Sequence, residues 1–276
     1  MIDGFDTAAF VRATLAEDMG AGGDRTSAAV IPADAVLTAV MDSRDSVTVA
    51  GLPLAAAFFR ALDPDCVITT LVDEGACVVA GTDLMRISGN ARALLGAERS
   101  ALNTVQHLTG IATLTRAYVD AIAGTGAILL DTRKTLPGLR ALEKYATRMG
   151  GATNHRMRLD DGVMIKDNHI AVAGGVDAAV RAAKAAGLTG VVVEIDTLDQ
   201  IAPALAAGAD RLLLDNMGPD TLRQAVALIA GRVPTEASGG VNLATIRAIA
   251  ETGVTFISVG RITQSAPAAD IGLDFS

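Results

Sequence analysis

The sequence is poor in cysteine, and it has no long apolar run. Its 276 residues include only Cys66 and Cys77, with no CxxC or Cys/His metal pattern around them. So few thiols exclude a disulfide scaffold and favour a reducing compartment. No apolar run approaches the roughly 20 residues of a membrane span, and Asp3 and Asp6 stand where a signal peptide carries basic residues. We therefore expect a soluble, cytoplasmic protein with no membrane partner.

Excess positive charge is also lacking, since the formal net charge is −8. Duplex binding depends on many Lys and Arg side chains, so nucleic acid is not an expected partner. Between Asp131 and His169, however, eight basic residues stand against five acidic ones: Arg133, Lys134, Arg140, Lys144, Arg148, Arg156, Arg158 and Lys166. This local excess indicates an anion-binding region. Arg140, Lys144 and Arg148 follow one another at spacing four, which is typical of the solvated face of a helix.

The second half of the chain alternates short β-branched runs with Ala-rich helical patterns. This alternation is typical of βα units around a parallel sheet. Six strands are predicted, at residues 127–131, 163–166, 190–195, 211–215, 234–237 and 255–259. Helices are predicted between them at 176–186, 198–207, 219–230 and 243–251. Six such units favour an α/β barrel.

The first half has a different pattern. Residues 36–49 alternate apolar and polar side chains, which indicates a half-exposed strand or hairpin, and short strands are predicted at 66–72 and 83–87. Helices are predicted at 7–19, 54–62 and 92–122. We predict an α+β domain over residues 1–110 and an α/β barrel over 111–265. Apolar residues alternate again near the carboxyl terminus, so residues 266–276 are expected to return to the first sheet.

Polar residues or glycines follow every predicted barrel strand. In α/β barrels the reactive groups stand at the carboxyl ends of the strands. These positions hold Asp131 to Thr135, Lys166, Glu194, Asp215, Ser238 to Gly240, and Gly260. Each one alone could be ordinary surface, but six together favour a site.

Glycine-rich turns after the last two strands of a barrel form a typical phosphate cradle. Ser238, Gly239, Gly240 and Gly260 fit that arrangement, although tight turns need glycine as well. Glu194 and Asp215, beside so many cations, suit ribose hydroxyls or Mg²⁺. Salt bridges to the same lysines are the alternative.

Several longer segments carry a family resemblance. They include DTRKTLPGLRALEKYA from Asp131, GGATNHRMRLDDGVMIKDNHI from Gly150, EASGGVNLATIRAIAETGV, and ERSALNTVQHLTGIAT in the first half. The chain resembles the quinolinate phosphoribosyltransferases (nicotinate-nucleotide pyrophosphorylases, carboxylating) over nearly its whole length. One departure is Ala152, where members of the family often have a third glycine.

The resemblance implies an α/β fold, with an amino-terminal open-faced sandwich followed by an incomplete, six- or seven-stranded TIM-like barrel. It implies a pentosyltransferase of NAD biosynthesis that joins quinolinate to phosphoribosyl pyrophosphate and releases nicotinate mononucleotide, CO2 and pyrophosphate. Members are dimers or multiples of dimers, in which an arginine, here Arg99, completes the neighbouring site.

The resemblance also implies residue roles. Arg133, His155, Arg156, Lys166 and Arg99 would line the quinolinate pocket, because guanidinium forks match carboxylates. Lys134 and Lys166 would reach the pyrophosphate. Glu194 and Asp215 would bind ribose hydroxyls or Mg²⁺, and Ser238, Gly239, Gly240 and Gly260 the 5′-phosphate.

Three other functions compete with this one. A paralogue with the same fold would act on another base, a non-catalytic binding protein would keep the fold alone, and an unrelated phosphate-binding barrel would share only the strand ends. The presence of Arg133, His155, Arg156 and Lys166 disfavours the first alternative. The pair Glu194 and Asp215 disfavours the second.

Overall fold

The computed structural model describes residue 2 and residues 4–275. The chain forms two compact units. The first consists of Met1–Arg116, Ala141–Gly151 and Ser265–Ser276, and the second of Ala117–Arg140 and Ala152–Gln264. Helix α4 (Ala91–Ala121) runs without a break through residue 110, where the domain boundary was predicted.

The first unit contains a four-stranded antiparallel sheet in the order β12-β1-β5-β3. Its strands are β1 (Val36–Ser43), β3 (Val67–Thr70), β5 (Thr82–Asn90) and β12 (Ile271–Phe275), and β2 (Val47–Thr48) pairs separately with β4 (Cys77–Val78). Helices α1 (Thr7–Met19), α2 (Arg25–Val30), α3 (Leu52–Leu62), α4 and α5 (Arg140–Met149) complete it. The carboxyl-terminal strand β12 pairs with β1, with Leu273 opposite Met41.

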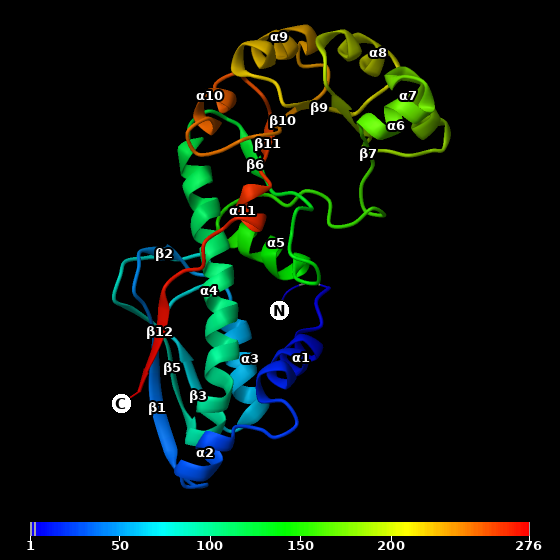
Figure 1. Ribbon diagram of the computed structural model, residues 1–276. Coiled ribbons are helices and arrows are strands. Elements are labelled where there is room, and N and C mark those ends of the chain that lie inside the picture. The colour runs from blue at the N-terminus through cyan, green and yellow to red at the C-terminus, as the bar shows by residue number, and fades with distance from the viewer. Residues whose placement is uncertain (1, 3, 276) are drawn as a thin grey trace. The chain divides into compact units, whose positions relative to one another are not determined.

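One face of this sheet carries the core of the first unit. Along β1, Ala39 and Met41 are buried, because successive side chains of a strand point to opposite faces. They pack in one cluster with Phe58 and Phe59 of α3 and with Val105 of α4. Figure 1 shows α3 and α4 along the same side of the strands, which is the expected open-faced sandwich.

Two glycines of α4 differ in the space around them. A Cβ at Gly110 would lie 1.9 Å from the carbonyl oxygen of Pro267, whereas a Cβ at Gly96 would meet only side chains, at 3.4 Å or more. We expect Gly110→Ala to lower the free energy of unfolding by about 1 to 3 kcal/mol or more, because backbone must move. Gly96→Ala should raise it by up to about 1 kcal/mol, the helix propensity of alanine over glycine. Urea unfolding of both variants tests this, and equal shifts would contradict the close packing at Gly110.

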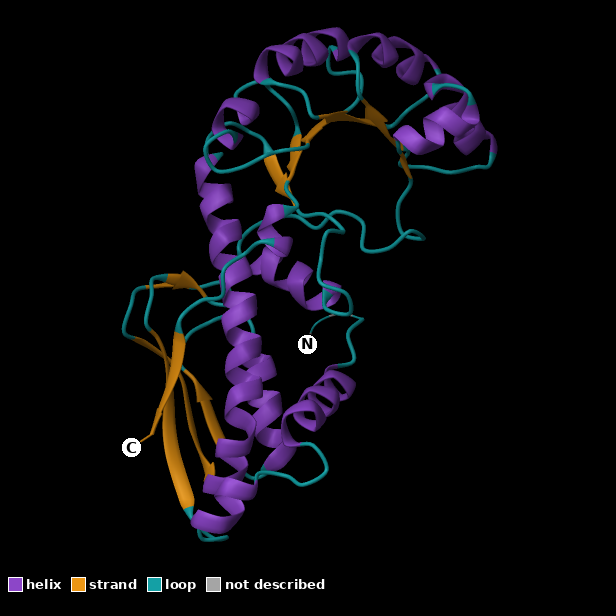
Figure 2. Ribbon diagram, in the orientation of Figure 1, coloured by secondary structure: helices purple, strands orange, loops and turns teal. Residues whose placement is uncertain are grey.

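The second unit contains a six-stranded parallel sheet in the order β6-β11-β10-β9-β8-β7. Its strands are β6 (Ile128–Leu130), β7 (Met164–Ile165), β8 (Val192–Ile195), β9 (Arg211–Asp215), β10 (Thr235–Ser238) and β11 (Phe256–Ser258). Its helices are α6 (Asp167–Ala173), α7 (Val176–Ala185), the 3-10 turn η1 (Leu198–Gln200), α8 (Ile201–Ala206), α9 (Pro219–Ile229), α10 (Ile246–Ala250) and α11 (Arg261–Gln264). Figure 2 shows the strands curving, with helices outside the curve.

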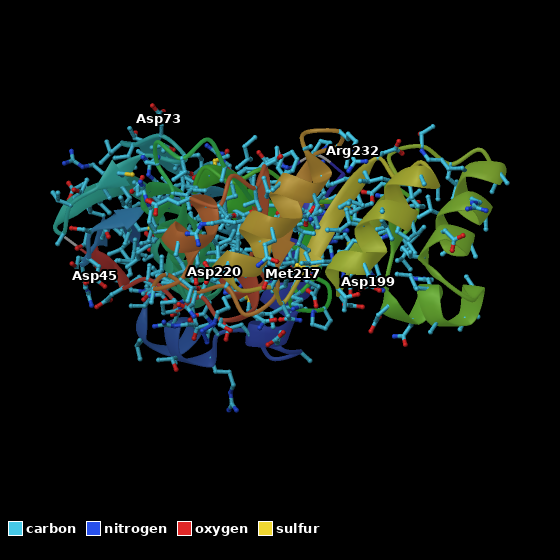
Figure 3. All side chains as sticks on the ribbon, turned by 90° about the horizontal axis from the view of Figure 1, so that it is seen from above. Asp45, Asp73, Asp199, Met217, Asp220 and Arg232 are labelled. Atoms are coloured by element: carbon cyan, nitrogen blue, oxygen red, sulfur yellow. The ribbon has the colours of Figure 1, made fainter. Side chains whose placement is uncertain are left out.

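The barrel is incomplete, since β6 and β7 form the two edges of the sheet. This confirms the predicted fold class. The outer helices have ordinary local signals, as α9 shows. It begins with Pro219 in its first turn and ends at Ala230 in a left-handed conformation, and Arg232 donates to carbonyls of its last turn. Figure 3 shows Arg232 and Asp220 on this helical layer, where both are exposed.

The structure corrects one interpretation of the basic residues. Lys144 was predicted on a solvated helix face, but it is fully buried in α5. Tyr145 donates to Glu74 and Glu143 pairs with His107, so α5 packs inward around Lys144, whereas Arg148 is exposed as predicted and Arg140 is partly buried. A spacing of four predicts which helical residues share a face, not whether that face meets solvent.

Candidate active site

The carboxyl ends of all six barrel strands border one cavity of about 620 Å³ in the second unit. Every predicted site residue of that unit lines it: Arg133, Lys134, His155, Arg156, Lys166, Glu194, Asp215, Ser238, Gly239, Gly240 and Gly260. Parallel strands bring their carboxyl ends to one face, so residues far apart in the sequence meet there. Arg99 is not among the lining residues, and it lies exposed on α4 of the first unit.

Two guanidinium groups lie near each other in the cavity wall. Arg156 is partly buried, and its pKa is lowered by that burial and by the charge of Arg133. The Nε of Arg133 is buried and has no hydrogen-bond partner among the described residues. A buried donor of this kind favours an acidic ligand, because an unpaired polar group is costly. The pair suits a ligand with two negative charges.

Hydrogen bonds fix the position of the segment between α5 and β7, which carries His155 and Arg156. Asp131, fully buried after β6, accepts a hydrogen bond from the His155 backbone N–H at 2.8 Å. Asn154 also donates to this carboxylate. Arg156 Nη1 donates to the Gly162 carbonyl at 3.0 Å. From the sequence, Asp131 was predicted only as one of the polar residues that follow the barrel strands, and its contact with residues 154 and 155 was not predicted.

Carboxylates also line the cavity. Glu194 at the end of β8 is paired with Lys166, whose Nζ lies 3.1 Å from Oε2. Carboxylate oxygens of Glu194, Asp196 and Asp215 all lie within 4.8 Å of one another. Asp196 was missed in the sequence, because it follows a strand in a loop rich in ordinary polar residues. Three carboxylates so close form a donor set of the kind that Mg²⁺ takes.

Burial changes the acidity of two of these groups. The pKa of Glu194 is raised by burial, which outweighs the lowering effect of Lys166. The pKa of Asp215 is also raised, by burial first and then by the negative charge of Asp196. Both effects disfavour the ionised form, whereas a cation bound here would favour it.

The glycine-rich loop after β10 lies against the end of β9. Gly239 has φ +91°, and a Cβ there would lie 2.2 Å from Asn216 Oδ1 and 2.8 Å from the Asn216 backbone nitrogen. Asn216 itself has φ +53° and donates its N–H to the Ser238 carbonyl at 2.8 Å. Only glycine at 239 allows this approach. The following helix α10 begins at Ile246, three residues later than predicted, so loop amides rather than a helix end line the cavity.

Gly260, after β11, is a second glycine whose missing side chain leaves room for a neighbouring residue. A Cβ there would lie 2.7 Å from Lys134 Cδ, so the missing side chain makes room for the lysine. The Lys134 carbonyl accepts a hydrogen bond from Thr263 at 2.7 Å. Arg261 and Gln264 also line the cavity, and neither was predicted from the sequence. Arg158, by contrast, is an exposed loop residue paired with Asp160.

Residues 24–109 match the family model for the N-terminal domain of quinolinate phosphoribosyl transferase, and residues 111–274 match the model for its C-terminal domain. The chain belongs to this family. Among its curated relatives is the probable nicotinate-nucleotide pyrophosphorylase [carboxylating] of Synechocystis sp. It is 46% identical over 236 residues, which are 84% of this chain and 80% of the relative.

Other members of the family are similar over almost the entire chain. The nicotinate-nucleotide pyrophosphorylase [carboxylating] of Mycobacterium leprae is 43% identical over 271 residues, covering 96% of this chain and 95% of its own. The solved nicotinate-nucleotide pyrophosphorylase of Francisella tularensis is 40% identical, with a TM-score of 0.94 and coverage of 100% and 99%. Family and fold are thus shared across both units. In the described residues, no helix has the length and apolar character needed to cross a membrane.

Proposed function

We propose that this protein is a decarboxylating quinolinate phosphoribosyltransferase, which makes nicotinate mononucleotide for NAD synthesis. The supporting observation is the cavity itself, where five Lys and Arg side chains, a glycine-rich loop and the strand-end carboxylates Glu194 and Asp215 line one space. A pyridine diacid requires paired cationic donors, and a sugar phosphate requires backbone N–H groups and hydroxyl acceptors. No other function considered for the sequence uses all three features.

The two guanidinium groups hold the substrate acid. Arg133 and Arg156 bind the two carboxylates of quinolinate, and His155 and Lys166 complete that side of the pocket. Guanidinium forks fix the plane of the ring as well as its charge. The ring nitrogen is thereby held toward the anomeric carbon of the sugar. Arg99 of a second copy supplies a further donor, so the active form is a dimer or a multiple of dimers.

The sugar is held by the other walls. Amides of the loop Ser238 to Gly240, together with Gly260, bind the 5′-phosphate, while Lys134 and Lys166 contact the pyrophosphate. Glu194 and Asp215 bind ribose hydroxyls or, with Asp196, hold Mg²⁺. The closeness of these three carboxylates fits such an ion. Bound Mg²⁺ would supply positive charge to the pyrophosphate oxygens.

The chemistry consists of two steps. The lone pair of the ring nitrogen forms a bond to the anomeric carbon, while the bond from that carbon to pyrophosphate breaks and its electron pair leaves with pyrophosphate. The two lysines stabilise the charge that develops there. The ring nitrogen is now positive, so the adjacent carbon can keep the electron pair when its carboxylate departs as CO2. That carbon then takes a proton from water, and positioning supplies much of the catalysis.

The direct test is to incubate the purified protein with Mg²⁺, quinolinate and phosphoribosyl pyrophosphate. We expect nicotinate mononucleotide, CO2 and pyrophosphate in equal amounts. Nicotinate, which lacks the carboxylate beside the ring nitrogen, is the control substrate and should react far more slowly. Absence of product, or equal use of nicotinate, would contradict the proposal. We place the reaction in the cytoplasm, in keeping with the scarcity of cysteine.

The raised pKa values predict a dependence on pH. Because Glu194 and Asp215 bind protons more readily than ordinary carboxylates, they lose charge at a higher pH as the solution is acidified. We expect kcat/KM for phosphoribosyl pyrophosphate to fall as the pH decreases from 7 toward 5. Glu194→Gln should be about tenfold less efficient at pH 7, with a shallower acidic fall. If the two profiles run parallel on the acidic side, the titration belongs to the substrate phosphates instead.

A further inference from the structure

Glu236 stands out among the residues of the cavity because it is a carboxylate in an anion site. It lies on β10 and lines the cavity, and its side chain is 0% exposed. Burial alone would raise its pKa, but His155, Ser258 and Arg211 together outweigh burial and lower it. The contact with the Arg211 guanidinium makes Glu236 the negative partner of an ion pair. A buried negative charge beside this cavity repels the anionic substrates proposed to bind there. Its presence therefore suggests that Glu236 has a function that outweighs this repulsion.

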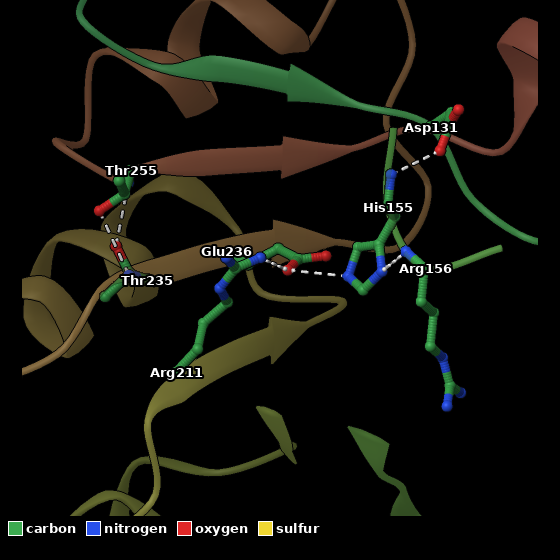
Figure 4. A network of polar contacts seen from close by, with 7 residues as sticks. All are labelled: Asp131, His155, Arg156, Arg211, Thr235, Glu236 and Thr255. Atoms are coloured by element: carbon green, nitrogen blue, oxygen red, sulfur yellow. Dashed lines mark hydrogen bonds and ion pairs between the residues drawn. The ribbon is translucent and has the colours of Figure 1, made fainter. Parts of the chain in front are cut away.

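One carboxylate oxygen of Glu236 contacts both the His155 imidazole and the Arg211 guanidinium. Its Oε2 lies 3.3 Å from His155 Nε2 and 3.2 Å from Arg211 Nη1 (Figure 4). The Arg211 guanidinium also lies 4.2 Å from the centre of the Phe256 ring. Arg211 is not among the residues that line the cavity. It can thus balance the charge of Glu236 without contacting substrate.

The hydrogen bonds of His155 define where its proton lies. The Arg156 backbone N–H donates to His155 Nδ1 at 2.8 Å, so Nδ1 must carry a lone pair. In the neutral ring the proton is then on Nε2, which donates to Glu236. Figure 4 shows the resulting chain of contacts from Glu236 through the imidazole to Arg156. Asp131 fixes the same loop through the His155 backbone N–H.

We propose that Glu236 is a positioning residue that keeps His155 in the Nε2–H tautomer and thereby directs Arg156 into the cavity. In the other tautomer, Nδ1–H would face the Arg156 N–H, and two donors would meet. The loop would have to open to avoid this, displacing the guanidinium that binds the acid. The inference rests on the proposed function, because it is the quinolinate carboxylates that Arg156 meets.

Three variants separate positioning from stability. Glu236→Met removes the acceptor at similar length, Glu236→Gln keeps a neutral acceptor, and Arg211→Met removes the other partner of the same oxygen. Measurements on each full-length protein are KM for both substrates, the thermal midpoint, and the 15N chemical shifts of His155. The shifts distinguish Nε2–H from Nδ1–H directly and need no catalysis.

We expect wild type to show the Nε2–H tautomer. Glu236→Met should mix the tautomers and raise KM for quinolinate about tenfold, the loss of one charged hydrogen bond, with a much smaller change for phosphoribosyl pyrophosphate. Glu236→Gln should keep the tautomer and recover most of that loss, because a neutral acceptor remains. Arg211→Met should lower the thermal midpoint and leave the tautomer unchanged, and the unbalanced charge of Glu236 should raise KM for both anionic substrates alike.

Three results would overturn the inference: Nδ1–H in wild type, an equal rise of KM for both substrates in Glu236→Met, or a rise of KM confined to quinolinate in Arg211→Met. If Glu236→Met does not fold, wild type and Glu236→Gln still decide, since both must show Nε2–H. A wild-type protein that makes no mononucleotide would refute the proposed function instead, and the tautomer would still be measurable.

Discussion

Gly239→Ala is expected to raise KM for phosphoribosyl pyrophosphate at least about tenfold, with a smaller effect on quinolinate. The added Cβ would lie 2.2 Å from Asn216 Oδ1 and 2.8 Å from the Asn216 backbone nitrogen. The loop would have to move away from the end of β9, which would break the 2.8 Å hydrogen bond between the Asn216 N–H and the Ser238 carbonyl. The amides proposed to bind the 5′-phosphate would move with the loop. Their distance from Asp215 would therefore change.

Gly240→Ala is the matched comparison for this change. Gly240 also has a positive φ, +62°, but a Cβ there would meet nothing within 4 Å. The change should cost only the backbone strain of alanine in the left-handed region, about 1 to 2 kcal/mol, and have a much smaller effect on KM. Steady-state kinetics of both variants, with circular dichroism to verify folding, test this. Equal effects would show that backbone strain, not the collision with Asn216, governs the loop.

Arg156→Ala is expected to reduce kcat/KM for quinolinate tenfold or more. Each charged hydrogen bond lost to a carboxylate corresponds to about 1.5 to 3 kcal/mol. Burial and the neighbouring charge of Arg133 both lower the pKa of Arg156, so both disfavour its positive charge in the absence of an anion. A carboxylate ligand that contacts both guanidinium groups would offset the repulsion between them.

Two further variants sharpen the test of Arg156. Arg156→Lys keeps the charge but loses the planar fork, so it should recover only part of the activity. Arg158→Ala removes an arginine two residues away that is exposed and does not line the cavity, so its kinetics should match wild type. Competitive inhibition by pyridine mono- and dicarboxylates then reports which carboxylate contact is lost. Unchanged turnover in Arg156→Ala would remove the residue from the substrate site.

Much of the candidate site could be predicted because it follows from strand ends. Lys166, Glu194 and Asp215 each end a short apolar run, and in a parallel sheet those ends share one face. The structure places these residues around one cavity. Asp196 and Arg261 were missed, since a polar residue in a loop has no pattern of its own. Lys144 was wrongly placed on a solvated face, because spacing along a helix does not reveal what packs against it.

Glu236 illustrates the same limit in a different way. It lies within a strand and precedes the glycine-rich loop, so in the sequence it is an ordinary polar residue of a motif. Its contacts with His155 and Arg211 join three segments that lie far apart along the chain. Their meeting depends on the order of β9 and β10 in the sheet and on the path of the segment between α5 and β7, which carries His155.

The sequence by itself determined the βα repetition, the alternation of the first sheet, the family and the set of charged residues at strand ends. These properties are local, because periodicity and short motifs depend only on neighbours along the chain. Only the tertiary structure decided which groups contact the two ring nitrogens of His155, which atoms of Asn216 leave no room for a side chain at position 239, and which carboxylates stand within 4.8 Å of one another. Those properties depend on distances between segments remote in sequence, which are set only once the strands have assembled into the curved sheet.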